Sequence, residues 1–488
     1  MNRRNFLKAA GAGMLSAIAL PKFAAGQTTP VKPNVVLILV DDLGWADVGC
    51  YCAQYGNTWY ETPNIDRLAS QGMKFTQGYA ACAVCSPTRA ATLTGRYPAR
   101  LGVTDWIRPS ESTTNPQGYE GSASKEVLCP KNYVFMDSSE ITIAEMLKPA
   151  GYTTCHVGKW HLGGSSFYPG AQGFDYNYGG CSWGHPFQGY FDPYGIPTLP
   201  PRQTGEYLTV RESDEALGFI ETAVGQEKPF FLYMAHYAVH MPIQAIAEIK
   251  QKYDNKPKPT GYENLNSAYA AMIESVDNAV GAIMDKLDAL GVADNTVVIF
   301  TSDNGGHVSV TTNKPLRSGK GYPYEGGIRE PWIVRWPGKI APGSTCDTPI
   351  ISPDALPTIC EMTAQPLPRN KTIDGVSLVP LLKQSGKIPE RTLFWHYPHY
   401  RDNAELPYSV IRDEQWKLIK RYAGPAKYEL FDLKNDMSET TNMASSKPDI
   451  VKMLDEKLTG WIQKTKGKIP ITNPAYKKAA ENKRAQIG

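Results

Sequence analysis

In this 488-residue chain, two polar clusters have residue types and positions that most directly indicate metal-dependent chemistry. Asp41 and Asp42 follow one short apolar run, and Asp303 and Asn304 follow another. Three carboxylates that met without a cation would repel one another, so the two clusters together predict a divalent metal site. Oxygen ligands favour Ca²⁺ or Mg²⁺ over Zn²⁺. A single aspartate would be explained better as a turn or helix-capping residue, so the metal prediction depends on the presence of two clusters.

A cysteine motif further along the chain supplies a candidate nucleophile. The segment from Cys85 to Arg89 reads C-S-P-T-R, and T-G-R follows at residues 94–96. These residues resemble the signature of the type I sulfatases, C-x-P-x-R with a downstream T-G-R, within the alkaline phosphatase-like superfamily. A pattern with only three fixed positions recurs by chance. If the motif stood alone, a structural cysteine beside a turn proline would explain it.

Further segments resemble sulfatase sequence blocks and occur in the order of that family. Besides the acidic clusters, they are G-K-W-H ending at His161, H-M-P beginning at His240, and a glycine-rich segment around Lys320 that leads to E-G-G-I-R at 325–329. The resemblance extends over roughly residues 33–460. It is to arylsulfatase-like enzymes, and it implies a bacterial carbohydrate sulfatase.

The resemblance implies that a modified residue hydrolyses sulfate esters. In that family the cysteine is oxidised after translation to formylglycine, so Cys85 would become 3-oxoalanine. One hydroxyl of the hydrated aldehyde would attack sulfur, and the other would expel sulfate from the covalent intermediate. A sulfated thiol would lack that second hydroxyl. The partner implied during biogenesis is a formylglycine-generating enzyme or an anaerobic sulfatase-maturating enzyme.

The resemblance also implies a set of metal ligands. Asp41, Asp42, Asp303 and Asn304 would bind one divalent cation together with the modified Cys85. The family usually binds Ca²⁺, and Mg²⁺ is the less favoured alternative.

The other matched residues would stabilise charge and transfer protons. Arg89 would hold the formylglycine and metal region, while Lys159 and Lys320 would contact the sulfate oxygens. His161 would assist deprotonation of the diol, and His240, with Lys320, would donate a proton to the leaving alcohol. A histidine beside an apolar strand is more often a hydrogen-bonded core residue, so these two histidine roles depend on the order of the motifs.

Two other functions remain open on the sequence alone. A phosphatase or phosphodiesterase of the same superfamily would usually have Ser or Thr as nucleophile and ligands for two metal ions. This chain has Cys85 and matched ligands for one. A non-catalytic glycan-binding relative would be expected to lack some of Cys85, Arg89, Lys159 and His240, and all four are present.

Aromatic and basic residues outside these motifs are candidates for substrate recognition. Flat aromatic faces stack on sugar rings, and His and Arg suit nearby anionic groups. Ordinary packing between domains explains the same segments equally well. An exported bacterial sulfatase most often resembles enzymes that desulfate glycans, so we expect a sulfated saccharide as substrate. The candidate contacts are Trp106, Arg108, His185, Trp395, His396 and His399.

Buried strands and the helices between them must position these residues. Apolar runs at 35–40, 229–235 and 296–301 are typical of strands buried on both faces of a sheet. Thr142 and Glu145 predict a capping box at the start of one intervening helix. Strands that alternate with helices predict an α/β fold, with a large mostly parallel sheet sandwiched by helices. In such folds, polar residues just past the strand ends face the ligand crevice.

The pattern changes after about residue 370. Residues 408–411 and 416–422 flank a short polar turn and predict an antiparallel hairpin, and a helix is expected from Asp449 to about Lys464. We therefore expect a catalytic domain at 30–370 and a smaller C-terminal α+β domain, an antiparallel sheet plus a helix, at 371–466. A polar, basic tail would follow at 467–488.

The first 26 residues have the pattern of an export signal. Arg3 and Arg4 precede an uncharged run at 9–20, and small residues follow at 24–26. The run is too short to span a bilayer, so no membrane span is expected. The segment from Arg3 to Lys8 resembles the twin-arginine signal of bacterial export, and an ordinary secretory signal is the alternative. Either predicts a periplasmic or extracellular protein.

Composition and charge exclude other classes of protein. The hydrophobic fraction of 42% is too high for a disordered polymer. Removing residues 1–26 takes away four basic residues and no acidic residue, which lowers the net charge from +3 to −1. Neither value indicates a nucleic-acid partner.

The odd number of cysteines fits the proposed modification. Conversion of Cys85 would leave eight of the nine. In an oxidising compartment these eight could pair as disulfides, and some could instead stay as buried free thiols.

Overall fold

A computed structural model describes residues 32–263, 265–401 and 405–476. The predicted export signal at 1–26 and the end of the predicted tail, 477–488, lie outside these described residues. All of the described residues except Lys32 belong to one unit, Pro33–Gly488. Within the described ranges, none of the helices combines the length and apolar character that crossing a bilayer requires.

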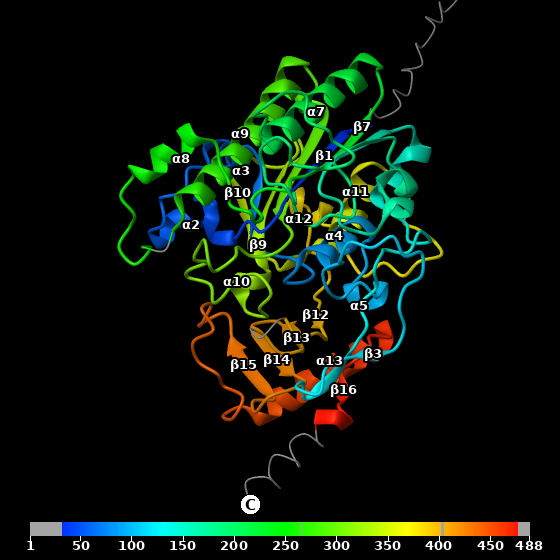
Figure 1. The fold of residues 1–488 in the computed structure, drawn as a ribbon, viewed down its shortest axis with the longest axis vertical. Helices are drawn as coiled ribbons and strands as arrows, with labels where there is room; N and C mark the ends of the chain where they lie inside the picture. The colour runs from blue at the N-terminus through cyan, green and yellow to red at the C-terminus, as the bar shows by residue number, and fades with distance from the viewer. Residues whose placement is uncertain (1–31, 264, 402–404, 477–488) are drawn as a thin grey trace, which may run out of the picture. The chain divides into compact units, whose positions relative to one another are not determined.

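A nine-stranded sheet forms the centre of this unit (Figure 1). Its order is β10-β2-β9-β8-β1-β7-β5-β6, with β11 also paired to β2. Strand β1 is parallel to both neighbours, β7 and β8, whereas β9 runs antiparallel to β2 and β8. The expected mostly parallel sheet is therefore confirmed. The bounds are β1 Asn34–Val40, β2 Met73–Tyr79, β5 Thr153–Gly158, β6 Tyr176–Tyr178, β7 Phe230–Ala235, β8 Thr296–Ser302, β9 Arg329–Arg335, β10 Ser344–Cys346 and β11 Ile350–Ile351.

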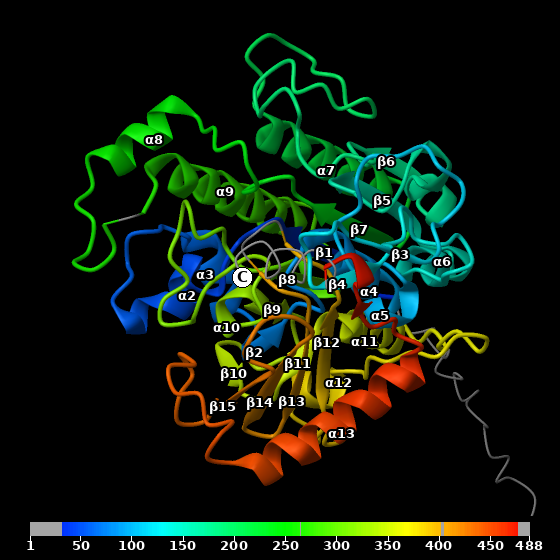
Figure 2. The same cartoon turned by 60° about the horizontal axis from the view of Figure 1, so that its bottom comes forward.

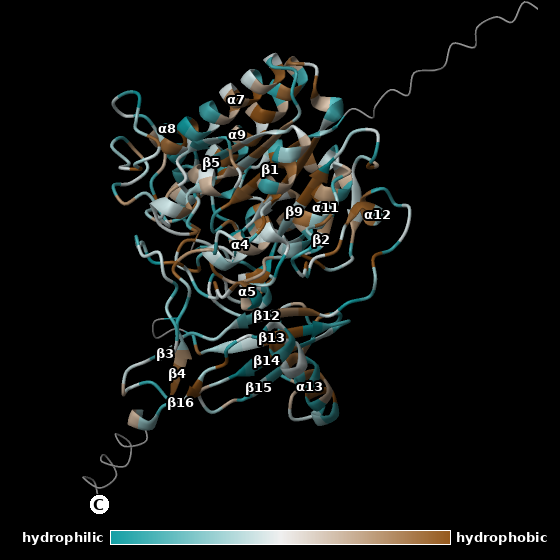
Figure 3. Cartoon of the chain, turned by 90° about the vertical axis from the view of Figure 1, so that its right-hand side faces the viewer, coloured by the Kyte–Doolittle hydropathy of each residue, from teal (hydrophilic) through white to brown (hydrophobic). Residues whose placement is uncertain are grey.

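Helices cover both faces of the sheet because its central strand is apolar at successive positions. Alternate side chains of a strand point to opposite faces, so Val36 and Ile38 enter one core while Val35 and Leu37 enter another. Figure 3 shows the strands around β1 largely in the hydrophobic colour. The first core includes α3 (Pro63–Ser70), α7 (Leu208–Gly225) and α9 (Ser267–Ala289); the second includes α4 (Cys85–Thr94), α6 (Ile143–Leu147), α11 (Ala355–Met362) and α12 (Val379–Leu382).

Short helices complete the described part of the chain. The predicted capping box of α6 is confirmed, since the Glu145 amide donates to Thr142 Oγ1 (3.2 Å) and the Thr142 amide donates to Glu145 Oε2 (2.9 Å). The remaining α-helices are α2 (Gly49–Cys52), α5 (Pro98–Leu101), α8 (Ala247–Asp254) and α10 (Glu325–Ile328).

The C-terminal part forms a four-stranded antiparallel sheet with one long helix, as the sequence predicts. Its strands are adjacent in chain order, and the predicted hairpin is formed by β13 and β14. Figure 2 shows α13 lying along this sheet, and the two share a core. The elements are β12 (Leu393–Tyr397), β13 (Tyr408–Asp413), β14 (Trp416–Arg421), β15 (Tyr428–Asp432) and α13 (Pro448–Thr465).

A small third sheet ties the end of the described chain to an early loop. Strand β16 (Ile471–Thr472) pairs with β4 (Val127–Pro130), which pairs with β3 (Tyr119–Glu120). The first part of the predicted tail, residues 467–476, is thereby attached to the molecule. The domain division near residue 370 stays a prediction, and α12, which lies beyond it, packs in the core of the large sheet.

The nine cysteines of the chain are all free thiols, and seven of them are buried. The sequence left two alternatives open for the eight cysteines other than Cys85, and in the structure they are buried or half-buried free thiols. Cys52, Cys155 and Cys181 lie in the first core, and Cys360 lies in the second.

Candidate active site

The acidic residues that follow β1 and β8 meet at the carboxyl edge of the large sheet, as the sequence predicts. The amide of Asp303 donates to the carbonyl of Val40 (3.1 Å), and the amide of Asp42 donates to Asp303 Oδ1 (3.2 Å). Asp42 has a φ of 59°, a left-handed conformation that is uncommon for a residue with a side chain. Such conformations persist where the surrounding structure enforces them, which is common at functional sites.

Four side chains converge here in a way that suits a cation. Ligand atoms of Asp41, Asp42, Cys85 and Asp303 all lie within 4.8 Å of one another, and all four residues are buried. The neighbouring Asn304 donates through Nδ2 to Asp42 Oδ1 (2.8 Å), while its buried Oδ1 has no hydrogen-bond partner among the described residues. An unpartnered amide oxygen beside crowded carboxylates is the donor set that a hard cation binds.

The crowding of carboxylates is visible in their pKa values. Burial and the neighbouring Asp41 carboxylate raise the pKa of Asp303 to about 6. Burial alone would raise the pKa of Asp42 as well, but the nearby cations, Lys320 foremost, hold it well below its usual range. Both carboxyl groups have a cation beside them, but at Asp303 burial and the Asp41 carboxylate outweigh the lowering effect of Arg89 on the pKa.

Two buried cations hold the acidic cluster from the side of α4 and β5. Arg89 places Nε and Nη2 at 2.9 and 2.8 Å from Asp303 Oδ2 and donates through Nη1 to the carbonyl of Lys159 (2.9 Å). Lys159 places Nζ 2.5 Å from Asp41 Oδ2. Both cations are fully buried, and neither lines the cavity that opens beside Cys85. The structure thus brings Lys159 to a carboxylate of the cluster, next to the region where sulfate was expected.

Cys85 is the first residue of α4, after the extended Val84. Its Sγ lies 3.4 Å from Asp41 Oδ1. Burial, with the Asp41 carboxylate as the second cause, raises the pKa of the thiol above its ordinary value. Because the thiolate is the reactive form of cysteine, the unmodified side chain is a weak nucleophile in this environment.

A cavity of about 430 Å³ opens beside Cys85. Three more of the predicted catalytic residues, His161, His240 and Lys320, line it. Lys320 Nζ lies 2.7 Å from Asp42 Oδ1 and 2.7 Å from Oδ2, so a cation stands between the acidic cluster and the cavity. The predicted catalytic residues are thereby divided between the cavity wall and the buried layer behind it.

The two histidines present different nitrogens. His161 donates through Nε2 to the carbonyl of Ile107 (2.6 Å), and its buried Nδ1 has no partner among the described residues. His240 donates through Nδ1 to the carbonyl of Met241 (2.8 Å), and its Nε2 lies 3.7 Å from Asp42 Oδ2. Burial is the main cause that lowers the pKa of both imidazoles well below the usual value. Each neutral ring therefore has one nitrogen that accepts a proton.

Three of the six predicted substrate contacts also line this cavity, namely Trp106, Arg108 and His185. The Arg108 guanidinium lies 5.3 Å from the centre of the Trp106 ring, and the His185 ring stacks on that of His240 with the centres 5.7 Å apart. Trp106 is 41% exposed, so its face is available to a ligand. The cavity therefore combines an aromatic surface with a cation, as the substrate prediction requires.

The other three predicted contacts do not line this cavity. Trp395 is buried in the core of the C-terminal sheet, and its indole nitrogen donates to a backbone carbonyl (2.7 Å). The buried rings of His396 and His399 are hydrogen-bonded to the hydroxyl groups of Ser409 (2.7 Å) and Thr104 (2.8 Å). Burial lowers the pKa of His396 to about 4 and that of His399 to about 3. The ring nitrogens of these three side chains are therefore hydrogen-bonded to other segments of the protein.

Eight further residues line the cavity without having been selected from the sequence, namely Val84, Asp105, Pro109, Gly184, Phe187, Tyr397, Tyr400 and Arg401. Tyr397 and Tyr400 belong to the same aromatic segment as Trp395, His396 and His399, so this segment reaches the cavity through residues other than the three that were selected. Phe187 follows His185 by two positions, and its ring is 50% exposed. Asp105 and Arg401 have no local signal, since each reaches the cavity through contacts with distant segments.

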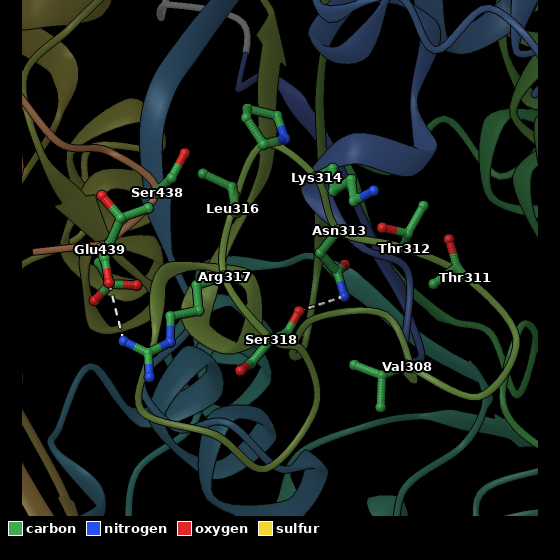
Figure 4. Close-up of a pocket in the computed structure, with 12 residues that line it drawn as sticks. Val308, Thr311, Thr312, Asn313, Lys314, Leu316, Arg317, Ser318, Ser438 and Glu439 are labelled. Carbon is green, nitrogen blue, oxygen red and sulfur yellow. Dashed lines mark hydrogen bonds between the residues drawn. The ribbon is translucent and has the colours of Figure 1, made fainter. Parts of the chain in front are cut away.

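A separate cavity of about 650 Å³ borders the loop before Lys320 (Figure 4). Arg317 donates through Nη1 to the carbonyl of Glu439 (2.9 Å), and Asn313 donates through Nδ2 to the carbonyl of Ser318 (2.9 Å). None of the predicted site residues lines this cavity. Its contacts instead attach the loop that carries Lys320 to the C-terminal part of the chain.

Family models match nearly all of the described chain. The model described as "Sulfatase" matches residues 33–364. A second model, "N-sulphoglucosamine sulphohydrolase, C-terminal", matches residues 319–464. Together they include every residue of the candidate site.

Individual proteins are similar over most of their length. A "Sulfatase" from Formosa agariphila is 33% identical, over 91% of this chain and 92% of its own length. Human "Arylsulfatase A" is 35% identical, over 79% of this chain and 75% of its own length. Among solved structures, that of Ps i-CgsB has a TM-score of 0.74 and 30% identity, covering 88% of this chain and 93% of its own. The same protein in complex with k-i-k-neocarrahexaose matches at a TM-score of 0.74 and 29% identity.

Proposed function

Because the chain belongs to the sulfatase family and is an enzyme that hydrolyses sulfate esters, we propose that it desulfates a saccharide, using formylglycine at position 85 and one divalent cation. The convergence of Asp41, Asp42, Asp303 and Cys85 within 4.8 Å beside a cavity carries this proposal. The cavity supplies room for an ester, and the buried cluster supplies the polar groups.

The cation site is proposed from the donor set. Asp41, Asp42, Asp303 and Asn304 would hold the cation with residue 85, and the unpartnered Asn304 Oδ1 fits this assignment. Ca²⁺ is favoured over Mg²⁺ because Mg²⁺ keeps several waters, whereas a dedicated set of protein oxygens suits Ca²⁺. A bound cation would supply positive charge at the point where the sulfate oxygens meet residue 85.

The modification of Cys85 is supported by the chemistry of its surroundings. A buried thiol whose pKa is raised is a poor nucleophile, whereas a hydrated aldehyde supplies one hydroxyl for attack and another for release of sulfate. The modification needs a formylglycine-generating enzyme or an anaerobic sulfatase-maturating enzyme as a partner in biogenesis.

The histidines are proposed to move protons at two different atoms. His161 Nδ1 is unpartnered and accepts a proton from the hydroxyl groups at position 85. His240 Nε2 borders the cavity beside Lys320, and in its protonated form it donates to the leaving alcohol. The negative charge of a bound sulfate ester would favour that protonated form, since an anion nearby raises the pKa of an imidazole.

The buried and cavity-facing cations have separate roles in this proposal. Lys320 borders the cavity and would contact the sulfate oxygens. Arg89 and Lys159 hold Asp303 and Asp41 in place from behind. Lys159 would reach sulfate only after Asp41 turned toward the cation, because the ammonium is now bound to that carboxylate.

The proposed substrate is a sulfated glycan, and the proposed location is outside the cytoplasm. Trp106, Arg108 and His185 give the cavity an aromatic face and cations suited to an anionic sugar. A similar protein has been solved in complex with k-i-k-neocarrahexaose. The pattern of residues 1–26 supports export to the periplasm or the extracellular space.

Mass spectrometry of the peptide that contains residue 85 tests the mechanism. We expect a mass about 18 Da below that of the cysteine peptide, from exchange of the thiol for an aldehyde. Release of sulfate from a panel of sulfated glycans tests the substrate, with Cys85→Ala as the inactive control. Full activity with an unmodified thiol would contradict the mechanism, and hydrolysis restricted to aryl sulfates would contradict the glycan proposal.

A further inference from the structure

A second cavity, separate from the active site, has an unusually one-sided charge. It measures about 420 Å³, and five basic residues and no acidic residue line it. We call it the basic cavity, and its charged residues are Arg96, Arg100, Lys131, Lys466 and Lys468.

Within the described part of the chain, acidic side chains pair with only the two arginines of the basic cavity. Arg96 is paired with Glu140, and Arg100 lies 2.7 Å from Asp374. Glu140 is also shared with a lysine outside the cavity, and the buried Nε of Arg96 has no hydrogen-bond partner among the described residues.

The three lysines form no ion pair with any carboxylate in the described ranges. Lys466 and Lys468 are exposed, and Lys131 is half-buried. Lys468 donates to the neutral amide oxygen of Gln117 (3.0 Å). The concave surface therefore holds positive charge that the described chain does not balance.

Contacts between distant segments build the basic cavity. Strand β16 pairs with β4 and brings the lysines after α13 beside Lys131. Tyr133 packs against Gly102 so closely that a Cβ on this glycine would lie 2.4 Å from the ring. The carbonyl of Lys468 is 3.1 Å from His396 Nε2. The lysines are thus held together by packing and pairing that involve the whole C-terminal part.

The basic cavity and the active-site cavity share a wall. Thr104 lines the basic cavity, and the next residue, Asp105, lines the active-site cavity. The hydroxyl of Thr104 is hydrogen-bonded to His399 (2.8 Å), and the adjoining Tyr400 lines the active-site cavity. Neighbouring residues of the same short segments therefore border both cavities.

From these observations we propose that the basic cavity binds a second anionic group, a sulfate or carboxylate, of the same glycan whose sulfate ester occupies the active site. The proposal rests on the proposed function in taking a sulfated glycan as the substrate. It adds that the enzyme recognises an oligosaccharide with more than one negative charge.

A glycan fits this cavity better than an acidic protein surface or a membrane does. The cavity is concave, and the exposed amide of Gln117 on its lining can pair with sugar hydroxyls, while the hydroxyl groups of Thr104 and Thr465 are already hydrogen-bonded to His399 and Trp461. The face of Tyr133 suits a sugar ring. A flat anionic surface would reach the exposed Lys466 and Lys468 but would not enter the concavity that Lys131 and Tyr133 also line.

The test compares two triple variants of the full-length enzyme that lose the same charge. The control variant changes exposed lysines elsewhere, Lys339→Gln, Lys387→Gln and Lys434→Gln. The basic-cavity variant carries Lys131→Gln, Lys466→Gln and Lys468→Gln. None of these six residues lines the active-site cavity.

Binding and catalysis are measured with different probes. Affinity for tetrasaccharides of iota-carrageenan and chondroitin sulfate is measured by calorimetry on a Cys85→Ala background, and catalysis with 4-nitrophenyl sulfate. We expect the basic-cavity variant to bind the preferred tetrasaccharide about tenfold more weakly, as the loss of three charge interactions, two exposed and one half-buried, implies. Its affinity should also depend less on NaCl, while kcat/KM for 4-nitrophenyl sulfate stays unchanged.

Equal affinity in the two triple variants would overturn the proposal. It would also be overturned if the Cys85→Ala enzyme without lysine substitutions bound neither tetrasaccharide. A parallel loss of 4-nitrophenyl sulfate hydrolysis would also overturn it, because the lysines would then act on the active site. Failure of the proposed function has a different signature, which is the absence of sulfate release from aryl and glycan substrates alike.

Discussion

Two fully buried carboxylates in this molecule, Asp303 and Glu325, have opposite pKa shifts. Asp303 lies in the active-site cluster, where burial and Asp41 raise its pKa to about 6. Glu325 lies at the junction with the C-terminal sheet, where burial alone would raise its pKa, but Lys417 and two arginines lower it to about 2. Burial is common to both, so the difference comes from the neighbours.

The junction balances its charge from within the chain. Lys417 Nζ lies 2.9 Å from Glu325 Oε1 and 2.8 Å from Glu439 Oε1, and Tyr79 donates its hydroxyl to Glu325 Oε2 (2.7 Å). We call Tyr79, Glu325, Arg412, Lys417 and Glu439 the junction cluster. The active-site cluster gathers three carboxylates and leaves an amide oxygen unpartnered. Three cations, Arg89, Lys159 and Lys320, also lie on the carboxylates of the active-site cluster. What distinguishes this cluster from the junction is therefore the convergence of four ligand atoms beside a cavity, next to an amide oxygen that has neither a hydrogen bond nor an ion pair among the described residues.

The largest effect should come from Asp303→Asn. Removing a carboxylate from the active-site cluster should lower kcat/KM for sulfate release by at least about 10³-fold, because the charge that holds the cation and Arg89 is lost. Bound Ca²⁺, measured by elemental analysis, should fall with it. The matched control is Asp277→Asn, which changes another buried carboxyl group whose pKa is about 6, far from the site. Retained activity in Asp303→Asn would show that the active-site cluster, like the junction cluster, is a structural contact.

Lys417→Met should have the next largest effect, on stability. The substitution leaves Glu325 and Glu439 buried without their shared cation, so the free energy of unfolding should fall by about 3–5 kcal/mol. Lys420→Met, which breaks a more exposed pair with Asp455 (2.6 Å), should cost about 0.2–1 kcal/mol. Denaturant unfolding measures both. Similar losses in the two variants would show that the junction cluster contributes no more than a surface pair.

Added Ca²⁺ should stabilise the enzyme through the active-site cluster. At about 100 times its Kd, a cation that binds only the folded state raises the free energy of unfolding by about 2.7 kcal/mol. A rise in Tm with Ca²⁺ should therefore occur in the native enzyme and in Lys417→Met, and should be absent in Asp303→Asn. An equal rise in Asp303→Asn would place the cation elsewhere.

Acidification should have a smaller effect that originates outside both clusters. Burial lowers the pKa of His399 to about 3, so the folded state binds fewer protons than the unfolded state below about pH 6.5. The stability that this neutral ring contributes is present above that pH and is lost as the pH falls, by about 1.4 kcal/mol per pH unit. His399→Gln should show a shallower loss of stability between pH 7.5 and 5.5 in denaturant unfolding. An unchanged slope would assign the acid sensitivity to other groups.

Short-range sequence patterns were sufficient for the strands and for the acidic residues that follow them. The run before Asp41 is apolar at every position, which only a strand buried on both faces requires, and the carboxyl edge of a parallel sheet brings such strand ends together. The hairpin of β13 and β14 and the helix α13 could likewise be predicted from the sequence, because periodicity and turn residues are local properties. The cysteine motif could be identified because it is also local.

Tertiary structure alone decided which side chains reach each cavity. In the segment from Trp395 to Arg401 the sequence could identify an aromatic surface. Packing against distant segments buried Trp395, Tyr397 and His399 alike, but it placed only Tyr397 of these three, together with the less buried Tyr400, in the wall of the active-site cavity. The basic cavity joins segments more than 300 residues apart, and no local pattern specifies their approach. Side-chain chemistry is a property of the residue, whereas exposure depends on which distant surface covers it.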